Sequence, residues 1–470
     1  MWTRHLVGKY ISAAIFLFSL EGCGLSTNKA VPLSPDDNAQ LDTPLPITWT
    51  PILTKTIDHR PVILGAILFD GTGNDRLHMS REAHETIEGH LYDELNILKM
   101  PIFHYCAGAG TEPSKFRSLI DGALGDSVKD TAEKAAKKVI SEITTLRERQ
   151  PNADVRLLVS GFSRGAAAAR HFMNIVEQHW DEQGRTGDSP TFYALIFDTV
   201  STGQTNNLLL QVPIRADIFY HFVSEDERRI FFDLILDSPS NDVDGRVVTL
   251  KWPGVHSDIG ASYNTGIGAE YVAYTDAILS GMGLIAPRCY EVAGDVRSEG
   301  KNDSRWLLER AIGIGAPNTL NTPKYRNTKL VPISSMPETY RQQWKSRIFA
   351  LQFEGNLSNI VCVKEHHLGM LHFIVKRSRN SFEILSLPPL LLPTAKIQHN
   401  HTDYLLTYYA DGVTQSRIGI PAYDLDSIPE GHSIHLDLGI IIDNNNRAHF
   451  WWFVNNVRAQ EVVGKFYAKH

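Results

Sequence analysis

Apolar runs alternate with amphipathic stretches along the first half of the chain. Val62–Phe69 is a nearly continuous apolar run, which is typical of a strand buried on both faces of a parallel sheet. Between Asp126 and Arg147, valine, isoleucine and leucine recur at helical spacing, so this segment predicts a helix. Further short apolar runs lie at Ile102–Cys106, Val155–Ser160 and Phe192–Phe197. This alternation predicts an α/β fold with a doubly wound, mostly parallel sheet and helices on both faces.

The pattern changes beyond about residue 340, where short β-like runs dominate. These runs are Ser346–Phe353, Ile360–Val363, Met370–Val375, Ser381–Leu385, Ser433–Ile442 and His449–Phe453. Residues 341–470 are therefore expected to form a smaller β-rich C-terminal part that completes or caps the domain of residues 51–340. The proline- and leucine-rich stretch from Leu385 to Pro393 predicts an apolar loop that either packs inside the protein or meets lipid.

The N-terminal segment has the features of a bacterial lipoprotein signal. A short basic stretch precedes an apolar run from Tyr10 to Leu20, which is too short to span a bilayer comfortably. Leu-Glu-Gly-Cys then matches a lipobox, in which Cys23 accepts the diacylglyceryl group. Residues 1–22 are expected to be the signal peptide and residues 23–50 a polar tether. An ordinary secretory signal and an uncleaved anchor helix are the alternatives.

Charge and cysteine usage narrow the partners further. The 470 residues carry a formal net charge of −7 with no long basic run, which argues against a nucleic-acid partner. A lipidated Cys23 followed by Gly24 predicts membrane attachment in the bacterial envelope, on the periplasmic side of the outer membrane. The other cysteines are Cys106, Cys289 and Cys362. Their wide spacing predicts neither a disulfide framework nor a metal site, and leaves one disulfide as the alternative to free thiols.

A Gly-x-Ser-x-Gly pattern joins a predicted strand to a predicted helix. Gly161-Phe-Ser-Arg-Gly165 follows the run Val155–Ser160 and opens an alanine-rich helix. At such an elbow the serine is held in a strained turn with its Oγ exposed, and the next amide points at a developing oxyanion. Ser163 is therefore the predicted nucleophile and Arg164 a predicted oxyanion donor. A tight strand–helix turn with a merely solvated serine is the alternative.

Other predicted strand ends supply a glycine-rich loop and two carboxylates. After the first strand, the backbone amides of Gly71 and Thr72 are predicted to complete the oxyanion hole. A phosphate cradle is the weaker interpretation of this loop, because no Gly-Lys-Ser/Thr ending follows it. Asp258, on a glycine-flanked loop after Val247–Trp252, is the predicted triad acid. Asp198, at the end of another strand, is its rival, with a helix N-cap as its structural alternative.

The base is sought after the acid, because elbow-type hydrolases place serine, acid and histidine in that order. Candidates are His366, His367, His372, His399, His401, His432 and His435. His399 is the predicted base, since it follows a predicted strand end and precedes a polar loop, and His401 is the alternate. The His-x-His spacing also suits a metal, but no third ligand set accompanies it, so neither a metal nor another cofactor is expected.

Taken together, these motifs resemble the DUF2235 family of α/β-hydrolases, which contains phospholipase effectors of bacterial type VI secretion. The matching segments are Phe69–Asn74, Gly161–Ala166 and Gly254–Tyr263, with lesser matches at Tyr105–Thr111 and His221–Arg229. The resemblance implies an α/β-hydrolase-like fold, with Ser163 as nucleophile, Asp258 as acid and a later histidine as base. A family segment that carries the base is matched only loosely, by Lys396–His399 with Tyr404 beyond it.

The expected function is that of a serine-dependent lipid ester hydrolase, a phospholipase or esterase, acting on a phospholipid or another acyl ester. The lipobox departs from secreted effectors of this class, which usually lack a signal peptide, and indicates an enzyme kept at the membrane. The competing expectation is a catalytically silent hydrolase-fold lipoprotein that serves as an adaptor or immunity-type binding protein. The intact serine, acid and glycine-rich loop favour the enzyme.

Overall fold

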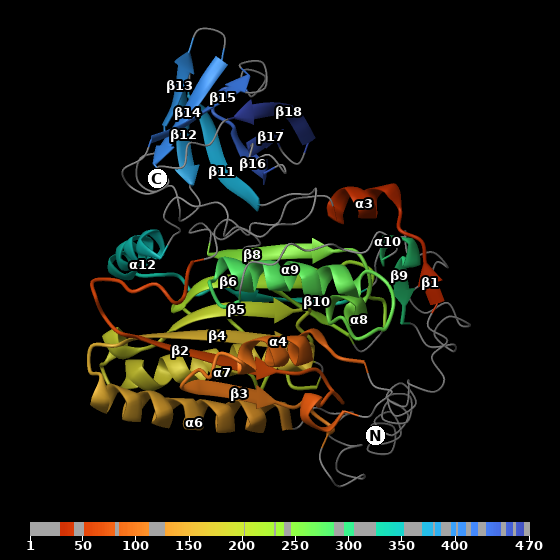
Figure 1. Cartoon of the computed structure of the whole chain (residues 1–470), viewed down its shortest axis with the longest axis vertical. Coiled ribbons are helices and arrows are strands. Elements are labelled where there is room, and N and C mark those ends of the chain that lie inside the picture. The colour runs from red at the N-terminus through yellow and green to blue at the C-terminus, as the bar shows by residue number, and fades with distance from the viewer. Residues whose placement is uncertain are drawn as a thin grey trace, which may run out of the picture.

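The computed structural model centres on a six-stranded parallel sheet with the order β3-β2-β4-β5-β6-β8 (Figure 1). It describes residues 29–41, 51–79, 84–111, 127–201, 203–229, 232–238, 246–285, 296–304, 326–351 and strands between residues 369 and 464. The sheet consists of β2 (Val62–Phe69), β3 (Ile102–Cys106), β4 (Asp154–Phe162), β5 (Thr191–Phe197), β6 (Ala216–Ser224) and β8 (Val247–Trp252). The predicted α/β-hydrolase-like fold is confirmed.

Helices cover both faces of this sheet and bury two separate hydrophobic clusters. One cluster lies between the sheet and the helices α6 (Ser127–Arg149) and α7 (Arg164–Glu182). The other lies beneath α4 (Ile87–Asn96), α9 (Gly268–Gly281) and α12 (Glu338–Ala350). Short elements fill the connections: η2 (Arg76–His78), η3 (Thr186–Asp188), β7 (Leu234–Ser238), α8 (His256–Ile259), α10 (Val296–Glu299) and β10 (Thr328–Pro332). Because parallel strands all end at one edge, the loops after β2, β4, β5 and β8 gather there.

The prediction of a β-strand at Ser346–Phe353 is wrong over most of its length, because residues 346–350 belong to α12. Trp344, Ile348 and Leu351 recur at helical spacing and are fully buried in the second cluster. The short apolar run is thus one buried face of a helix that starts before it. The helix crosses residue 340 and packs on the hydrolase core.

The C-terminal strands form sheets of their own, apart from the six-stranded sheet (Figure 1). A five-stranded sheet has the order β12-β11-β16-β17-β18, and a three-stranded sheet the order β13-β14-β15. Their bounds are β11 (Gly369–Ser378), β12 (Ser381–Ser386), β13 (Lys396–Asn400), β14 (Asp403–Tyr409), β15 (Gln415–Pro421), β16 (Ser433–Ile442), β17 (Ala448–Val454) and β18 (Val457–Gly464). The predicted run Ile360–Val363 and residues 387–393 lie outside the described residues.

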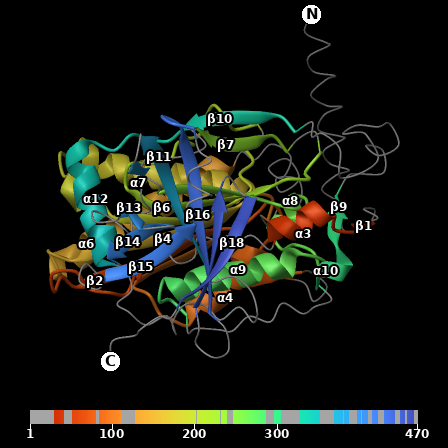
Figure 2. The same ribbon diagram turned by 90° about the horizontal axis from the view of Figure 1, so that it is seen from above.

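Part of the segment expected to be a tether is folded onto the hydrolase domain. β1 (Lys29–Val31) pairs antiparallel with β9 (Lys301–Asp303), and α3 (Pro35–Leu41) follows it (Figure 2). The signal segment and Cys23 lie outside the described residues, as do Cys289 and Cys362, while Cys106 is a free thiol. Within the described residues, no helix is both long and apolar enough to cross a membrane.

Candidate active site

Ser163 sits in a strained turn between β4 and α7. Its backbone has φ 61° and ψ −123°, a conformation that costs a non-glycine residue about 1–3 kcal/mol. The flanking glycines permit this turn: a Cβ on Gly161 would lie 2.5 Å from the Gly165 carbonyl oxygen, and one on Gly165 would lie 2.1 Å from the Phe69 carbonyl oxygen. The Ser163 hydroxyl does not cap the helix that it precedes. This is the geometry of a nucleophile elbow, with the helix start pressed against the end of β2.

Backbone hydrogen bonds bring Asp198 next to this elbow. The Ser163 amide donates to the Phe197 carbonyl at 3.0 Å, and the Ser163 carbonyl accepts from the Val200 amide at 3.2 Å. Asp198 lies between these two contacts, at φ 42°, and its side chain is fully buried. It caps no helix, so the N-cap alternative does not apply.

The Asp198 carboxylate holds a histidine and an arginine. Its Oδ2 lies 2.5 Å from His256 Nδ1, and Arg326 donates to both of its oxygens at 2.8 Å. The Ser224 amide adds a further hydrogen bond to Oδ1 at 2.9 Å. Burial alone would raise the pKa of Asp198, but the Arg326 charge and the His256 contact hold it well below its usual range. Asp198 is therefore an ionised hydrogen-bond acceptor.

His256 is the first residue of α8, on the loop that follows β8. Its ring stacks on Phe162, with ring centroids 4.7 Å apart, and meets Phe232 edge-on at 4.9 Å. Phe162 immediately precedes Ser163, so the stack places the imidazole beside the elbow. Burial lowers the pKa of His256, although Asp198 opposes this. With Nδ1 bound to Asp198, Nε2 is the ring nitrogen that can accept a proton.

Asp258, the acid predicted from the sequence, has other partners. One oxygen accepts from the backbone amides of Val255 at 2.9 Å and Asn302 at 3.0 Å, and the other accepts from Asn302 Nδ2 at 2.5 Å. Burial raises the pKa of Asp258 to about 6, although these hydrogen bonds lower it. The structure thus brings Asp258 to backbone amides and an asparagine, whereas it brings Asp198 to a histidine.

The predicted bases lie in the C-terminal part. His399 is the fourth residue of β13 and pairs in register with Tyr404 of β14, so it lies within a strand rather than after one. Its side chain and the whole of His401 lie outside what the structure describes. The structure therefore does not place either histidine beside Ser163, and their catalytic role stays a prediction.

The glycine-rich loop lies against the elbow, and one of its two predicted donors is already occupied. The Gly71 amide donates to Asp70 Oδ1 at 2.7 Å, which argues against Gly71 as an oxyanion donor. The Gly73 and Asn74 amides also bond within the described chain, to Ala109 and Gly71. Thr72 carries the amide of this loop with no acceptor among the described residues, and its Oγ1 is likewise buried without a partner there. Thr72 is thus the oxyanion candidate of this loop, and the helix-opening amide of Arg164 stays the candidate predicted from the elbow.

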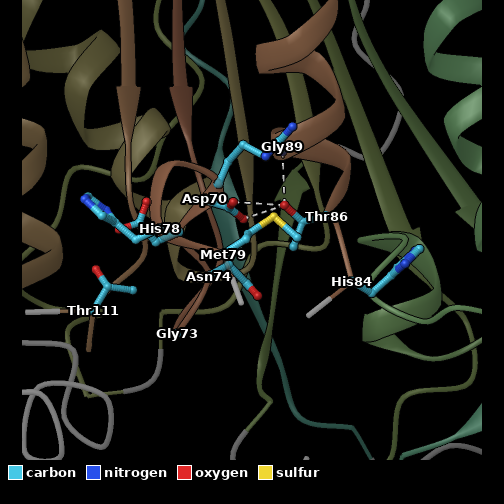
Figure 3. Close-up of a pocket in the computed structure, with 11 residues that line it drawn as sticks. Asp70, Gly73, Asn74, His78, Met79, His84, Thr86, Gly89 and Thr111 are labelled. Carbon is cyan, nitrogen blue, oxygen red and sulfur yellow. Dashed lines mark hydrogen bonds and ion pairs between the residues drawn. The ribbon is translucent and has the colours of Figure 1, made fainter. Parts of the chain in front are cut away.

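A polar pocket of about 340 Å³ opens beside this loop (Figure 3). Asp70 lies at its base, where Thr86 Oγ1 donates to both carboxylate oxygens at 2.9 Å, and His78 and His84 flank it on opposite sides (Figure 3). Burial raises the pKa of Asp70 to about 6, although hydrogen bonds from Tyr105 and Thr86 lower it. The pocket therefore offers hydrogen-bonding groups next to the oxyanion loop.

Sequence reasoning missed His256 and Arg326. The order of serine, acid and histidine holds along the chain if Asp198 is the acid, because His256 then comes last and follows the final strand of the sheet. With Asp258 as the acid, the expected order places the base after residue 258 and excludes His256, two residues before it. Arg326 carried no local signal, since its partner lies 128 residues away.

Comparisons with known proteins give distant structural neighbours. No family model matches the chain, and no curated protein matches it. The Tle1 effector bound to the VgrG spike of the Type 6 secretion system is 22% identical, with a TM-score of 0.30, over 45% of this chain and 53% of that one. An uncharacterized protein from Pseudomonas aeruginosa is 17% identical, with a TM-score of 0.36, over 64% and 61% of the two chains.

A third neighbour, acyl-protein thioesterase 2 from Zea mays, is 14% identical, with a TM-score of 0.23, over 48% of this chain and 97% of that one. The chain spans less than two thirds of the length of the first two proteins. The sheet order and the elbow of this chain carry the fold assignment on their own.

Proposed function

We propose that this protein is a serine-dependent ester hydrolase that acts on phospholipids or related acyl esters, with Ser163, His256 and Asp198 as its triad. The observation that carries the proposal is the buried Asp198–His256 contact of 2.5 Å beside a strained elbow serine. A merely structural turn needs neither the strain nor a histidine held by an ionised carboxylate.

In the proposed reaction Ser163 Oγ attacks the ester carbonyl while His256 Nε2 takes its proton. His256 then gives the proton to the leaving alcohol, and a water molecule hydrolyses the acyl-enzyme by the same route. Asp198 fixes the imidazole tautomer and stabilises the imidazolium, and the amides of Thr72 and Arg164 hold the oxyanion. The lowered pKa of His256 keeps the ring unprotonated, and thus able to act as a base, at neutral pH.

The lipid class of the substrate is supported by the motif resemblance to the DUF2235 family, which contains phospholipases. We also propose that the chain belongs to that family and that a lipidated Cys23 attaches it to the membrane. The polar pocket beside the oxyanion loop is suited to the polar part of such a substrate, because hydroxyl, carboxyl and imidazole groups line it.

The test measures fatty-acid release from mixed phospholipid vesicles and labelling by a fluorophosphonate probe. The wild type is compared with Ser163→Ala, His256→Ala and His399→Ala. We expect labelling of the wild type, loss of hydrolysis in the first two variants and retention in the third. Loss in His399→Ala with retention in His256→Ala would return the base to the C-terminal part. A wild type that neither labels nor hydrolyses any ester would mean a silent binding protein.

A further inference from the structure

We infer that residues 29–41, here called the N-terminal strap, are a positioning element for the catalytic histidine. The inference rests on the proposed role of His256 as the base. The strap comprises β1 and α3 and lies beside β9 in both views of the molecule (Figures 1 and 2). The strap supports residues 251–258, here called the histidine segment. This segment leaves the end of β8 and carries His256.

The first connection runs from β1 through β9 to Asp258. Ala30 pairs with Asn302, and Asn302 donates its side-chain and backbone N–H groups to the Asp258 carboxylate. Asp258 in turn accepts the Val255 amide, on the residue before His256. These contacts give the buried Asp258 carboxylate a structural role. It joins the histidine segment to β9, the strand that pairs with β1 of the strap.

The second connection runs through a buried lysine. Lys301 Nζ lies 2.8 Å from an oxygen of Asp37 in α3 and 2.9 Å from Asp226 Oδ2. That same Asp226 oxygen accepts the Gly254 amide at 2.7 Å, and the Asp226 amide donates to the Gly254 carbonyl at 2.9 Å. Asp37 of the strap and Asp226 are therefore the two carboxylates that hold Lys301 next to the histidine segment.

The third connection lies at the other end of the segment. Gln40 Nε2 donates to the Lys251 carbonyl at the end of β8. Leu41 is buried in the hydrophobic cluster, and its carbonyl accepts the Tyr274 hydroxyl at 2.8 Å. The strap thus contacts both ends of the segment and is itself anchored in the core.

The histidine segment needs such external support because its own secondary structure is small. α8 has four residues, which is too short to be stable without tertiary contacts. A misplacement of a catalytic group by about 1 Å can cost on the order of a hundredfold in rate. Loosening the strap is therefore expected to slow the chemical step while leaving substrate binding nearly unchanged.

The experiment uses Asp37→Ala in the full chain, with Asp36→Ala as its matched control. The two residues are neighbours in α3, but Asp37 is buried against Lys301 whereas Asp36 is exposed. For Asp37→Ala we expect kcat to fall roughly tenfold with KM within about twofold. Hydrogen exchange in residues 251–259 should accelerate by roughly the same factor, since local opening becomes easier. Asp36→Ala should match the wild type in both measurements.

A second variant displaces the strap by another route. A Cβ on Gly300 would lie 2.3 Å from the Val31 carbonyl oxygen, so Gly300→Ala should give the same pattern. Unchanged exchange in residues 251–259 for both variants would overturn the inference, as would a loss of kcat that affects Asp36→Ala equally. If the wild type hydrolyses no ester, the proposed function fails, and the exchange measurement still decides whether the strap holds the histidine segment.

Discussion

The Asp198 carboxylate has two tasks, orienting His256 and neutralising Arg326, and replacing it with asparagine impairs both. The carboxylate accepts from His256, Arg326 and the Ser224 amide, whereas an asparagine offers a single oxygen and presents an NH₂ group to one of these donors. The imidazole would then lose the tautomer that exposes a basic Nε2. For Asp198→Asn we expect kcat/KM to fall about 10³- to 10⁴-fold, which is about 4–5.5 kcal/mol of transition-state stabilisation.

The same substitution should also lower the free energy of unfolding. The Arg326 guanidinium is about 5% exposed and would lose the carboxylate that it contacts with both of its terminal nitrogens. Breaking a buried ion pair from one side costs about 3–5 kcal/mol. The double variant Asp198→Asn/Arg326→Met removes the stranded charge, so it should recover most of the unfolding free energy without recovering activity.

The assays are kcat/KM on a soluble ester and urea unfolding, both at pH 7.5. Asp258→Asn serves as the comparison, because Asp258 is bound to amides and an asparagine and should lose far less activity than Asp198→Asn. The reasoning would be refuted if Asp258→Asn lost the larger share of kcat/KM. It would be refuted equally if the double variant regained activity together with stability.

Three further predictions concern packing, pH-dependent stability and the pH profile of the base. Gly165→Ala should lower the free energy of unfolding by about 3 kcal/mol or more, because its Cβ would lie 2.1 Å from the Phe69 carbonyl oxygen. Gly187 has open space around it, so Gly187→Ala should change the free energy of unfolding in urea little. The pKa of Asp70 is raised to about 6 in the folded state. Protonated Asp70 therefore stabilises the fold below pH 4, and this stabilisation of about 3 kcal/mol is lost as pH rises through 6. The stability advantage of the wild type over Asp70→Asn should therefore shrink between urea titrations at pH 4.5 and pH 7.5, and an advantage that grows would contradict it. The Arg229 charge helps to lower the pKa of His256, so Arg229→Met should move the acid limb of the kcat/KM profile to higher pH, and a limb that moves to lower pH would exclude this role.

Much of the sheet could be predicted from local sequence because its strands are apolar runs. β2, β3 and β8 have the predicted bounds. β6 was missed because Asp217 and His221 interrupt its apolar pattern. Both residues are buried and paired, Asp217 with Arg347 at 2.6 Å and His221 with Asp237 at 2.8 Å. A strand that buries charges in satisfied pairs has no signal in a hydrophobicity pattern.

The candidate site likewise has one part that local sequence predicts and another that depends on distant residues. The Ser163 elbow is a five-residue motif, and its strained turn follows from the two glycines beside it. The identity of the acid depends on which carboxylate meets a histidine in space, and His256 lies 58 residues beyond Asp198. The strap was predicted from composition to be part of a tether. Its docking depends on pairing between β1 and β9, which lie some 270 residues apart along the chain.

The division of labour in this molecule has an evolutionary consequence. Ser163, Asp198 and His256 follow the ends of β4, β5 and β8, so one hydrogen-bonded sheet fixes their separations. The polar pocket is lined mainly by residues within 73–79 and 84–89 and by Thr111, which lie on connections after β2 and β3. Substitutions there leave the sheet untouched. If the proposed ester hydrolysis holds, substitutions in these loops can change the substrate of this scaffold while the sheet keeps the three residues in place.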